Sequence, residues 1–356
     1  MLIKVLLFEL RYRLNRPATY IYFGLLFFIA FLFIATDVVS IGGGQGNVTI
    51  NSPYTINQAI VILNLFAAMI CSAIMGVPVY RDFDNRFHEI LFTSPLTKNA
   101  YLIGRFLGSL IITLLVMSAM PLGIMIGSLM PWIDPEQLSP FNLCAYTQPF
   151  LTIVLPNTFF MGAIFFMVGS LTRNIFAIYV QGVMFLILYL ISNTLTGNLD
   201  DKLLAALLDP MGINASSEIT KFWTPAQRNQ FIIPLQGALL YNRLLWIAIG
   251  SVIYWAGYKF FKFNTLPLFS SKKKPQVVAE EPMHKLNLPP VQKRFDTNSA
   301  LKQFWKIFIF EAKMMYRTPI FMVLVSLGII NAVSNIALDT EMYDISTFPV
   351  TGKIIQ

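Results

Sequence analysis

Charged residues are scarce in this sequence. Asp, Glu, Lys and Arg make up 12% of the 356 residues, whereas apolar residues make up 56% and the mean hydropathy is +0.62. A soluble domain has roughly 25% charged residues. The chain therefore has too little polar side-chain surface to cover a water-soluble globule of this size, and its composition indicates a membrane protein.

Histidine and cysteine are also rare, with two of each. His88 and Glu89 begin a pattern like that of zinc proteases, but Phe92 stands where the second histidine ligand would have to be. The two cysteines, Cys71 and Cys144, are far apart in the sequence and form neither a disulfide framework nor a metal-binding spacing. We therefore expect no metal site and no cofactor.

The sequence lacks a phosphate-binding loop. Residues 42–46 read Gly-Gly-Gly-Gln-Gly, but they have no flanking strand and helix of the kind that phosphate binding needs. Gly352-Lys353 has no glycine five residues before it and no Ser or Thr after it. The chain is therefore predicted not to hydrolyse ATP by itself, and we expect no enzyme activity.

Long apolar runs are abundant. A membrane-spanning helix needs about 20 mostly apolar residues, and seven segments meet this requirement. The sixth contains Arg243 and Lys259 near its two ends, and their long side chains are expected to extend to opposite membrane interfaces. The runs predict an all-α, polytopic membrane protein with spans at Ala18–Thr36, Ile56–Val79, Phe106–Met130, Phe150–Leu171, Ile175–Leu195, Leu239–Phe261 and Ile320–Leu338.

The middles of the predicted spans contain no Asp, Glu, Lys, Arg or His. Ionisable groups at that depth usually serve ion or proton pathways, so their absence argues against an ion-coupled transporter. Polar residues such as Asn64, Ser109 and Thr113 are interpreted as interhelical hydrogen-bonding residues. The basic residues flank the apolar runs, so the net charge of +8 does not indicate nucleic-acid binding.

The distribution of basic residues predicts a cytoplasmic N-terminus. With that orientation, 21 of the 26 lysines and arginines lie on the cytoplasmic side, as the positive-inside rule requires. Residues 1–17 are then an amphipathic helix at the membrane surface, and 18–261 a six-span transmembrane half. The loop 196–238 is expected on the outer side, and 262–300 is a basic cytoplasmic linker.

The sequence contains an internal repeat. Glu9 and Pro17 recur as Glu311 and Pro319 at a constant offset of 302 residues, and an apolar run of similar length follows each proline. We interpret residues 301–356 as the start of a second transmembrane repeat, so that a six-span helical bundle is followed by one span of a second unit. On this interpretation the chain is a fragment of a longer polypeptide or a shortened gene product, truncated early in its second half.

The most charged segment close to the membrane is residues 80–100, between the second and third predicted spans. Ser94-Pro95 stops a helix here, because the residue before a proline avoids the α conformation. The residues before this stop predict one short helix over 81–95, with an apolar and a charged face, which suits docking in a groove of a soluble partner. The apolar residues at helical spacing are Phe83, Phe87, Ile90, Leu91 and Leu96.

This segment resembles the cytoplasmic loop of type-two ABC export permeases, the transmembrane subunits of ABC transporters. In that family an acidic and basic cluster, a Leu-rich turn, a Ser/Thr-Pro pair and a Tyr-x-x-Gly-basic motif precede the third span. The six-span layout over residues 1–261 is similar too. Two positions depart from the pattern: Arg86 replaces the usual glycine and Asp82 the usual glutamate. The matching residues are Arg81, Asp82, Glu89, Leu91, Ser94, Pro95, Leu96, Tyr101, Gly104 and Arg105.

The resemblance implies a function for the segment. In the family it forms a coupling helix that sits in a cleft of a separate ATP-binding cassette subunit and converts closure of the ATPase dimer into movement of the spans. It implies a permease component of an ATP-driven exporter in the inner (plasma) membrane, with that subunit, membrane lipid, and a second permease half or a homodimer partner as its partners. The residues expected at the ATPase-coupling interface are Arg81, Asp82, Arg86, Glu89, Leu91, Ser94, Pro95 and, from the N-terminal helix, Glu9.

A membrane scaffold or assembly factor that transports nothing shares this composition and topology. The two functions differ in their dependence on a nucleotide-binding subunit. A scaffold should not need the helix predicted over 81–95 to recruit an ATPase.

Overall fold

The computed structural model describes residues 1–36, 47–197, 202–263 and 297–316, together with Phe321 and Val325. All of the secondary structure in these residues is helical. The chain divides into two compact units, Met1–Phe269 and Ser270–Gln356.

Five of the six spans predicted in the first unit coincide with helices that are long and apolar enough to cross a membrane. The predicted fifth span falls on α10 (Ile175–Gly197), in which Ile175–Leu190 counts as a shorter apolar helix, so the six-span half stays a prediction. The seventh predicted span, apart from Phe321 and Val325, lies outside the described residues. The chain is thus an all-α, multi-pass membrane protein, as predicted. The helices long and apolar enough to cross a membrane are Pro17–Ala35 (α2), Pro53–Asp84 (α3 and α4), Lys98–Gly127 (α6 and α7), Leu143–Thr172 (α8, η2 and α9) and Gly237–Phe260 (α14).

Several of these helices are interrupted. The second span consists of α3 (Pro53–Met75) and α4 (Val77–Asp84), and the third of α6 (Lys98–Met117) and α7 (Ala119–Gly127). The fourth span begins with α8, which ends at Pro149, and then widens into one π-helical turn. The parts of the fourth span are α8 (Leu143–Pro149), η2 (Phe150–Val154) and α9 (Leu155–Thr172).

Polar caps make two helices start earlier than the apolar runs indicate. The Ser52 side chain accepts a hydrogen bond from the Thr55 amide at the start of α3, and Thr97 accepts one from Ala100 at the start of α6. Side-chain oxygens at such positions satisfy amide groups that the first helical turn leaves free. The predicted second and third spans began later because their first turns are partly polar.

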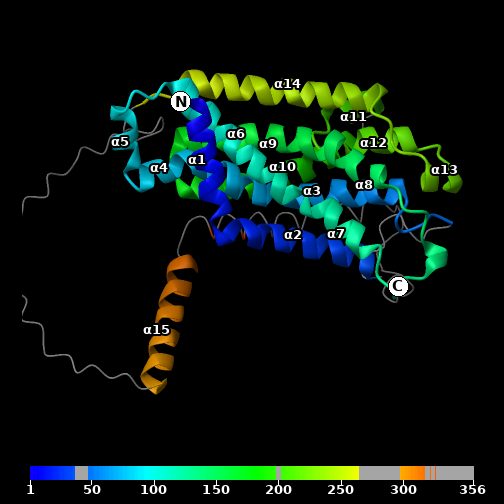
Figure 1. Ribbon diagram of the computed structural model, residues 1–356, viewed down its shortest axis with the longest axis horizontal. Helices are drawn as coiled ribbons and strands as arrows, with labels where there is room; N and C mark the ends of the chain where they lie inside the picture. The colour runs from blue at the N-terminus through cyan, green and yellow to red at the C-terminus, as the bar shows by residue number, and fades with distance from the viewer. Residues whose placement is uncertain (37–46, 198–201, 264–296, 317–320, 322–324, 326–356) are drawn as a thin grey trace, which may run out of the picture. The chain divides into compact units, whose positions relative to one another are not determined.

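The helices of the Met1–Phe269 unit pack in pairs (Figure 1). α2 packs on α7, α14 on α9, and α10 on α3. α9 comes close to the C-terminal end of α3 at two glycines, where a Cβ atom added to Gly169 would lie 2.0 Å from the Gly76 carbonyl oxygen. At one end of this unit α1 (Leu2–Leu14) crosses the bundle and packs on α6.

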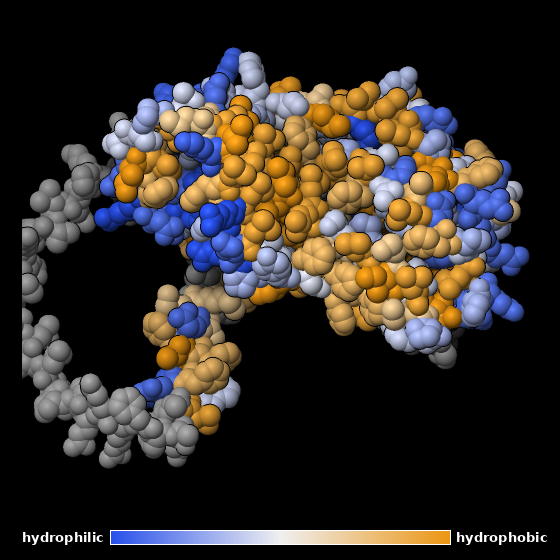
Figure 2. All heavy atoms as spheres, in the orientation of Figure 1, coloured by the Kyte–Doolittle hydropathy of each residue, from blue (hydrophilic) through white to orange (hydrophobic). Residues whose placement is uncertain are grey.

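Three short helices cover the opposite end of the bundle (Figure 1): α11 (Lys202–Leu208), α12 (Ile213–Thr220) and α13 (Pro225–Gln230). They belong to the predicted outer loop. Figure 2 shows that apolar side chains dominate the middle of the visible face of this unit, whereas polar side chains gather towards both ends. This distribution is what a bilayer requires of a membrane-spanning bundle.

The second unit contains α15 (Thr297–Tyr316). The positions 302 residues after α1, residues 304–316, all lie within α15. The second transmembrane repeat itself stays a prediction, because most of its residues lie outside those described.

Candidate functional site

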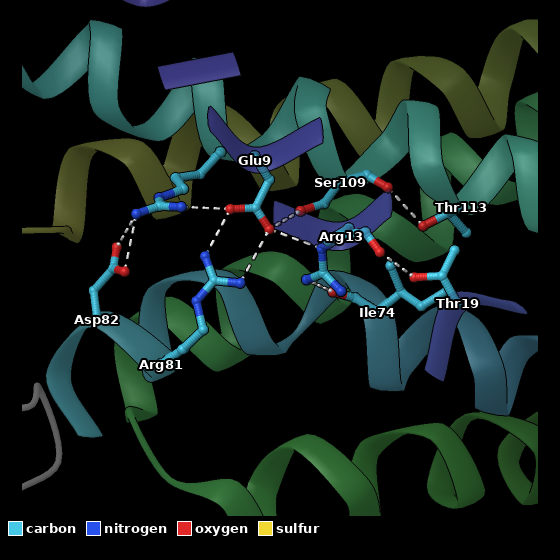
Figure 3. A network of polar contacts seen from close by, with 9 residues as sticks. Glu9, Arg13, Thr19, Ile74, Arg81, Asp82, Ser109 and Thr113 are labelled. Atoms are coloured by element: carbon cyan, nitrogen blue, oxygen red, sulfur yellow. Dashed lines mark hydrogen bonds and ion pairs between the residues drawn. The ribbon is translucent and has the colours of Figure 1, made fainter. Parts of the chain in front are cut away.

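A buried group of charged residues joins three helices at the end of the bundle where α1 lies (Figure 3). Its members are Glu9 and Arg13 of α1, Arg81 and Asp82 of α4, and Arg105 of α6. We call this group the three-arginine cluster. All four ion pairs found among the described residues belong to it.

Glu9 is the centre of the three-arginine cluster, with a side chain that is 0% exposed. Its Oε1 accepts from Arg13 Nε at 2.7 Å, its Oε2 accepts from Arg81 Nη2 at 2.7 Å, and Oε2 also pairs with Arg105. Burial by itself raises the pKa of Glu9, but the charges of the three arginines outweigh burial and lower the pKa to about 2. Glu9 is therefore ionised at neutral pH.

Asp82 provides the second link between α4 and α6. Its Oδ2 lies 2.8 Å from Arg105 Nη2, and it also accepts a hydrogen bond from the Tyr101 hydroxyl at 2.8 Å. Arg105 thus bridges both carboxylates, and its side chain is only 2% exposed. A buried carboxylate that is paired and hydrogen-bonded in this way fixes the separation of the two helices.

Arg13 provides a hydrogen-bond donor where the helix of the second span is interrupted. Pro78 has no backbone N–H, so the carbonyl oxygen four residues earlier, at Ile74, has no helical donor. Arg13 Nη2 donates to this oxygen at 2.7 Å (Figure 3). The side chain from α1 therefore holds together the point where α3 passes into α4.

Two glycines on α6 make room for α1. A Cβ atom at Gly104 would lie 2.8 Å from Val5 Cβ, and one at Gly108 would lie 2.8 Å from Glu9 Cβ. Any larger residue at these positions would push α1 away from α6. The distance between Glu9 and Arg105 would then increase, and their ion pair would be weakened. Gly104, part of the motif Tyr-x-x-Gly-basic, therefore acts by allowing this close packing.

The predicted single helix over 81–95 is wrong. α4 extends the second span as far as Asp84, and a separate helix, α5 (Phe87–Thr93), follows. Arg86 between them has φ 53°, in the left-handed region, which ends one helix and starts the next in a new direction. The sequence departs from the family pattern at this position, where glycine would adopt the same φ without strain.

The remaining expected interface residues lie outside the cluster. Arg86, Glu89, Ser94 and Pro95 are exposed, and Leu91 is half-buried. An apolar cavity of about 170 Å³, lined in part by Phe8 of α1, Phe87 and Leu91 of α5, separates the two helices. The structure thus brings Glu9, Arg81 and Asp82 together and leaves the other five around α5.

Sequence reasoning did not assign Arg13 and Arg105 to the site. The spacing of Glu9 and Arg13 was a usable signal, since residues four apart lie on one face of a helix. Arg105 is 96 residues from Glu9, and no local pattern links the two.

A second buried polar group lies at the other end of the bundle, and we call it the Arg243 cluster. Its members are Asn157 of α9, Asp209 between α11 and α12, and Asn242 and Arg243 of α14. Arg243 was expected to extend to the membrane interface, and this expectation is wrong. Its side chain points inward and donates to Asn157 Oδ1 at 2.6 Å and Asn242 Oδ1 at 3.0 Å, because these oxygens offer partners inside the protein.

Backbone amides hold the carboxylate of Asp209. Its Oδ1 accepts from the Met211 amide at 2.8 Å and its Oδ2 from the Asn214 amide at 2.7 Å. Burial raises the pKa of Asp209, and these amides and the charge of Arg243 only partly oppose it. Gly212, with φ 78°, lets the loop pass over Arg243, since a Cβ atom there would lie 2.3 Å from Arg243 Nη2. The Arg243 cluster therefore ties the loop between α11 and α12 to α9 and α14.

Comparison with known proteins places part of the chain in context. A family model described as ABC-2 family transporter protein matches residues 45–200. The matched segment includes α4, α5 and α6, and so contains Arg81, Asp82 and Arg105 but not Glu9. No curated protein matches the chain. The family match supports a multi-pass permease component of an ABC transporter. Separately, among the described residues no group of His, Cys, Asp and Glu could hold a metal ion.

Proposed function

We propose that this chain is the transmembrane permease of an ATP-driven exporter in the inner membrane and that it couples to a separate ATP-binding cassette subunit through α5. Its N-terminus lies in the cytoplasm, so the three-arginine cluster is on the ATPase side. A second permease half or a second copy of the chain completes the transport pathway. The observation that carries this proposal is the three-arginine cluster. It joins α1 to the second and third spans, and α5 directly follows α4 of the second span.

The three-arginine cluster supports the proposal because it would transmit a displacement of α5 to the membrane-spanning helices. α5 is joined to α4 by two residues, and α4 is fixed to α1 and α6 by buried ion pairs. A partner that pushes on α5 therefore moves α1, the second span and the third span together. Such coupled movement of spans is what an externally driven permease needs. The predicted spans have no ionisable groups at mid-membrane, the groups that usually couple transport to an ion gradient.

The exposed side of α5 supports the proposal by its chemistry. Arg86, just before α5, and Glu89 offer one charge of each sign, and Ile90, next to Glu89, is 67% exposed. An exposed apolar side chain close to charges of both signs is a suitable anchor for a groove in a soluble partner. The cavity between α1 and α5 leaves space for α5 to shift when it is loaded.

The test is purification of the tagged protein from its own host in mild detergent, followed by mass spectrometry of the co-purifying proteins. We expect a stoichiometric subunit with a Walker motif. The double variant Arg86→Glu with Glu89→Arg should lose that subunit while its amount in the membrane stays unchanged. The matched control is Glu136→Arg with Lys221→Glu, which reverses two exposed charges at the opposite end of the bundle and should keep the subunit.

Two results would contradict the proposal. Equal recovery of the ATPase by both double variants would remove α5 from the interface. Purification of the intact wild-type chain without any ATPase would favour the scaffold function instead.

A further inference from the structure

An apolar pocket opens between the third and fourth spans, and neither the three-arginine cluster nor the proposed ATPase interface includes it. Its volume is about 360 Å³, within the range of roughly 300–1,000 Å³ that small-molecule pockets occupy. One wall is formed by the end of α6 and by α7, and the other by α8 and η2. Both walls belong to helices that are long and apolar enough to cross the membrane.

Both walls of the pocket deviate from regular helix. On one wall α6 ends at Met117, and Pro121 in α7 has no N–H to continue the hydrogen-bond ladder. On the other wall α8 ends at Pro149, and Phe150 begins the π-helical turn. π-Helical turns inside α-helices are frequent at binding sites. Here an interruption at Pro121 on one wall and a π-helical turn on the other face each other across one pocket.

The polar groups of the pocket are all engaged within the protein. Ser118 donates to the Leu115 carbonyl at 2.7 Å, and Thr147 donates to the Leu143 carbonyl at 3.2 Å. The Tyr146 hydroxyl pairs with Ser128 at 3.0 Å, which keeps the buried ring as a wall. Each side-chain hydroxyl of the pocket thus already has a partner within the protein, and no charged residue lines the pocket.

The open side of the pocket faces away from the bundle. Leu122 is 38% exposed and Leu151 is 59% exposed, so the rim is apolar and lies on the outer surface of the spans. What surrounds such a surface in a bilayer is hydrocarbon. Residues 128–142, which connect the two walls, contain two acidic residues and no Lys or Arg, so no anionic headgroup is selected nearby.

From these observations we infer that this pocket binds an acyl chain of a membrane phospholipid, inserted sideways between the third and fourth spans and selected without regard to its headgroup. The chain fills a gap that the two helix breaks prevent side chains from closing. This inference depends on the membrane location of the spans and not on the proposed ATPase partner.

The experiment uses the full-length protein in vesicles that contain phosphatidylcholine with a photoactivatable diazirine in its acyl chain. After illumination, labelled peptides are identified by mass spectrometry. We expect labels to concentrate on residues 118–125 and 143–151. Met125→Trp, which fills the pocket, should lower this labelling several-fold, and the milder Leu122→Phe should lower it less.

The matched control is Leu115→Trp, because Leu115 is 41% exposed on the same span but does not line the pocket. It should leave labelling of the two segments unchanged. Elution of each variant as a single symmetric peak shows that the protein is folded. A phosphatidylglycerol probe with the same chains should label equally.

Three outcomes would overturn the inference. Labels spread evenly over all lipid-facing spans would show ordinary contact with the bilayer. Undiminished labelling in folded Met125→Trp would show that the pocket holds no chain. A strong difference between the two headgroups would show that the headgroup, and not the acyl chain, is recognised.

Discussion

The two buried polar clusters stabilise the bundle in different ways. In the three-arginine cluster, two carboxylates are balanced directly by guanidinium groups, with Glu9 contacting Arg13, Arg81 and Arg105. In the Arg243 cluster, Asp209 is held by backbone amides and Arg243 by amide oxygens of Asn157 and Asn242. The first cluster is a network of ion pairs, whereas in the second each charged side chain is held by neutral amide groups.

This difference determines what happens when one side chain is lost. Removing a carboxylate from the three-arginine cluster leaves buried positive charges facing each other. Removing Arg243 leaves amide oxygens without donors, while Asp209 keeps its backbone partners. Uncompensated buried charge costs more free energy than an unsatisfied neutral group, so the two clusters should respond unequally to equivalent substitutions.

The largest effect is expected for Glu9→Gln. Losing the carboxylate should destabilise the fold by about 3–5 kcal/mol, the range for breaking a buried ion pair. The measurement is the melting temperature of the purified protein in detergent, together with the yield of folded protein. The control is Glu311→Gln at the repeat-related position on α15, where the side chain is exposed. Equal melting temperatures for both variants would show that the three-arginine cluster contributes no stability.

The next effect is a loss of stability in acid. Because the pKa of Glu9 falls from its usual 4.5 to about 2 in the folded protein, ionised Glu9 stabilises the fold at every pH above 4.5. This contribution, about 3 kcal/mol, is lost as the pH falls from 4.5 to 2.

Melting temperatures measured between pH 6 and pH 2 test this point. The wild type should lose stability more steeply below pH 4.5 than Glu9→Gln, in which the titrating carboxyl group is absent. Parallel curves for the two proteins would mean that Glu9 does not titrate with a lowered pKa. Asp209 offers a contrast, since burial raises its pKa and it should not add to this acid-dependent loss.

A smaller effect is expected for Arg243→Met. The substitution leaves oxygens of Asn157 and Asn242 without their donor, which should cost about 1–3 kcal/mol. Lys259→Met on the same helix is the matched control, because Lys259 is exposed and lies only over the Trp255 ring. Limited proteolysis of the loop 196–238 reports the local effect. If Arg243→Met melts as low as Glu9→Gln, the distinction between the two clusters fails.

The smallest effect, and a stabilising one, is expected for Arg86→Gly. Arg86 is exposed and has a left-handed backbone conformation, which disfavours any residue with a Cβ atom by about 1–2 kcal/mol. Part of this gain is offset because glycine makes the unfolded chain more flexible. We expect a small rise in melting temperature.

Arg173→Gly is the comparison for that variant. Arg173 also has a left-handed backbone, with φ 49°, but its guanidinium lies 3.8 Å from the centre of the Phe83 ring and donates to the Lys262 carbonyl. Losing these contacts should cancel the gain. A rise in melting temperature for Arg173→Gly and none for Arg86→Gly would contradict the assignment of strain to Arg86.

The spans were predictable from the sequence because burial in a bilayer demands long apolar runs. Their ends were less so, since capping residues such as Ser52 and Thr97 extend helices through polar turns. The helix break at Arg86 became visible only from the left-handed backbone conformation of this residue. Its one signal in the sequence was that the resembling family usually has glycine at this position. Of the three-arginine cluster, the resemblance pointed to Glu9, Arg81 and Asp82, whereas the roles of Arg13 and Arg105 required the fold.

The error at Arg243 has a physical explanation. A basic residue near a helix end reaches water easily, and the sequence around Arg243 contains no signal for a buried partner. The partner Asn157 is 86 residues away and is itself buried in α9. A charge inside a predicted span is better treated first as a sign of a buried polar partner.

The contact between Gly76 and Gly169 has a mechanical consequence. It lies towards one end of a nearly continuous helical rod that runs from Pro53 to Asp84, with 8 residues of α4 on one side and 23 of α3 on the other. At about 1.5 Å per residue the two arms are roughly 12 Å and 35 Å long. If the rod pivots rigidly at this contact, with Arg13 stiffening the joint, a displacement at the end of α4 would be about threefold larger at the far end of α3.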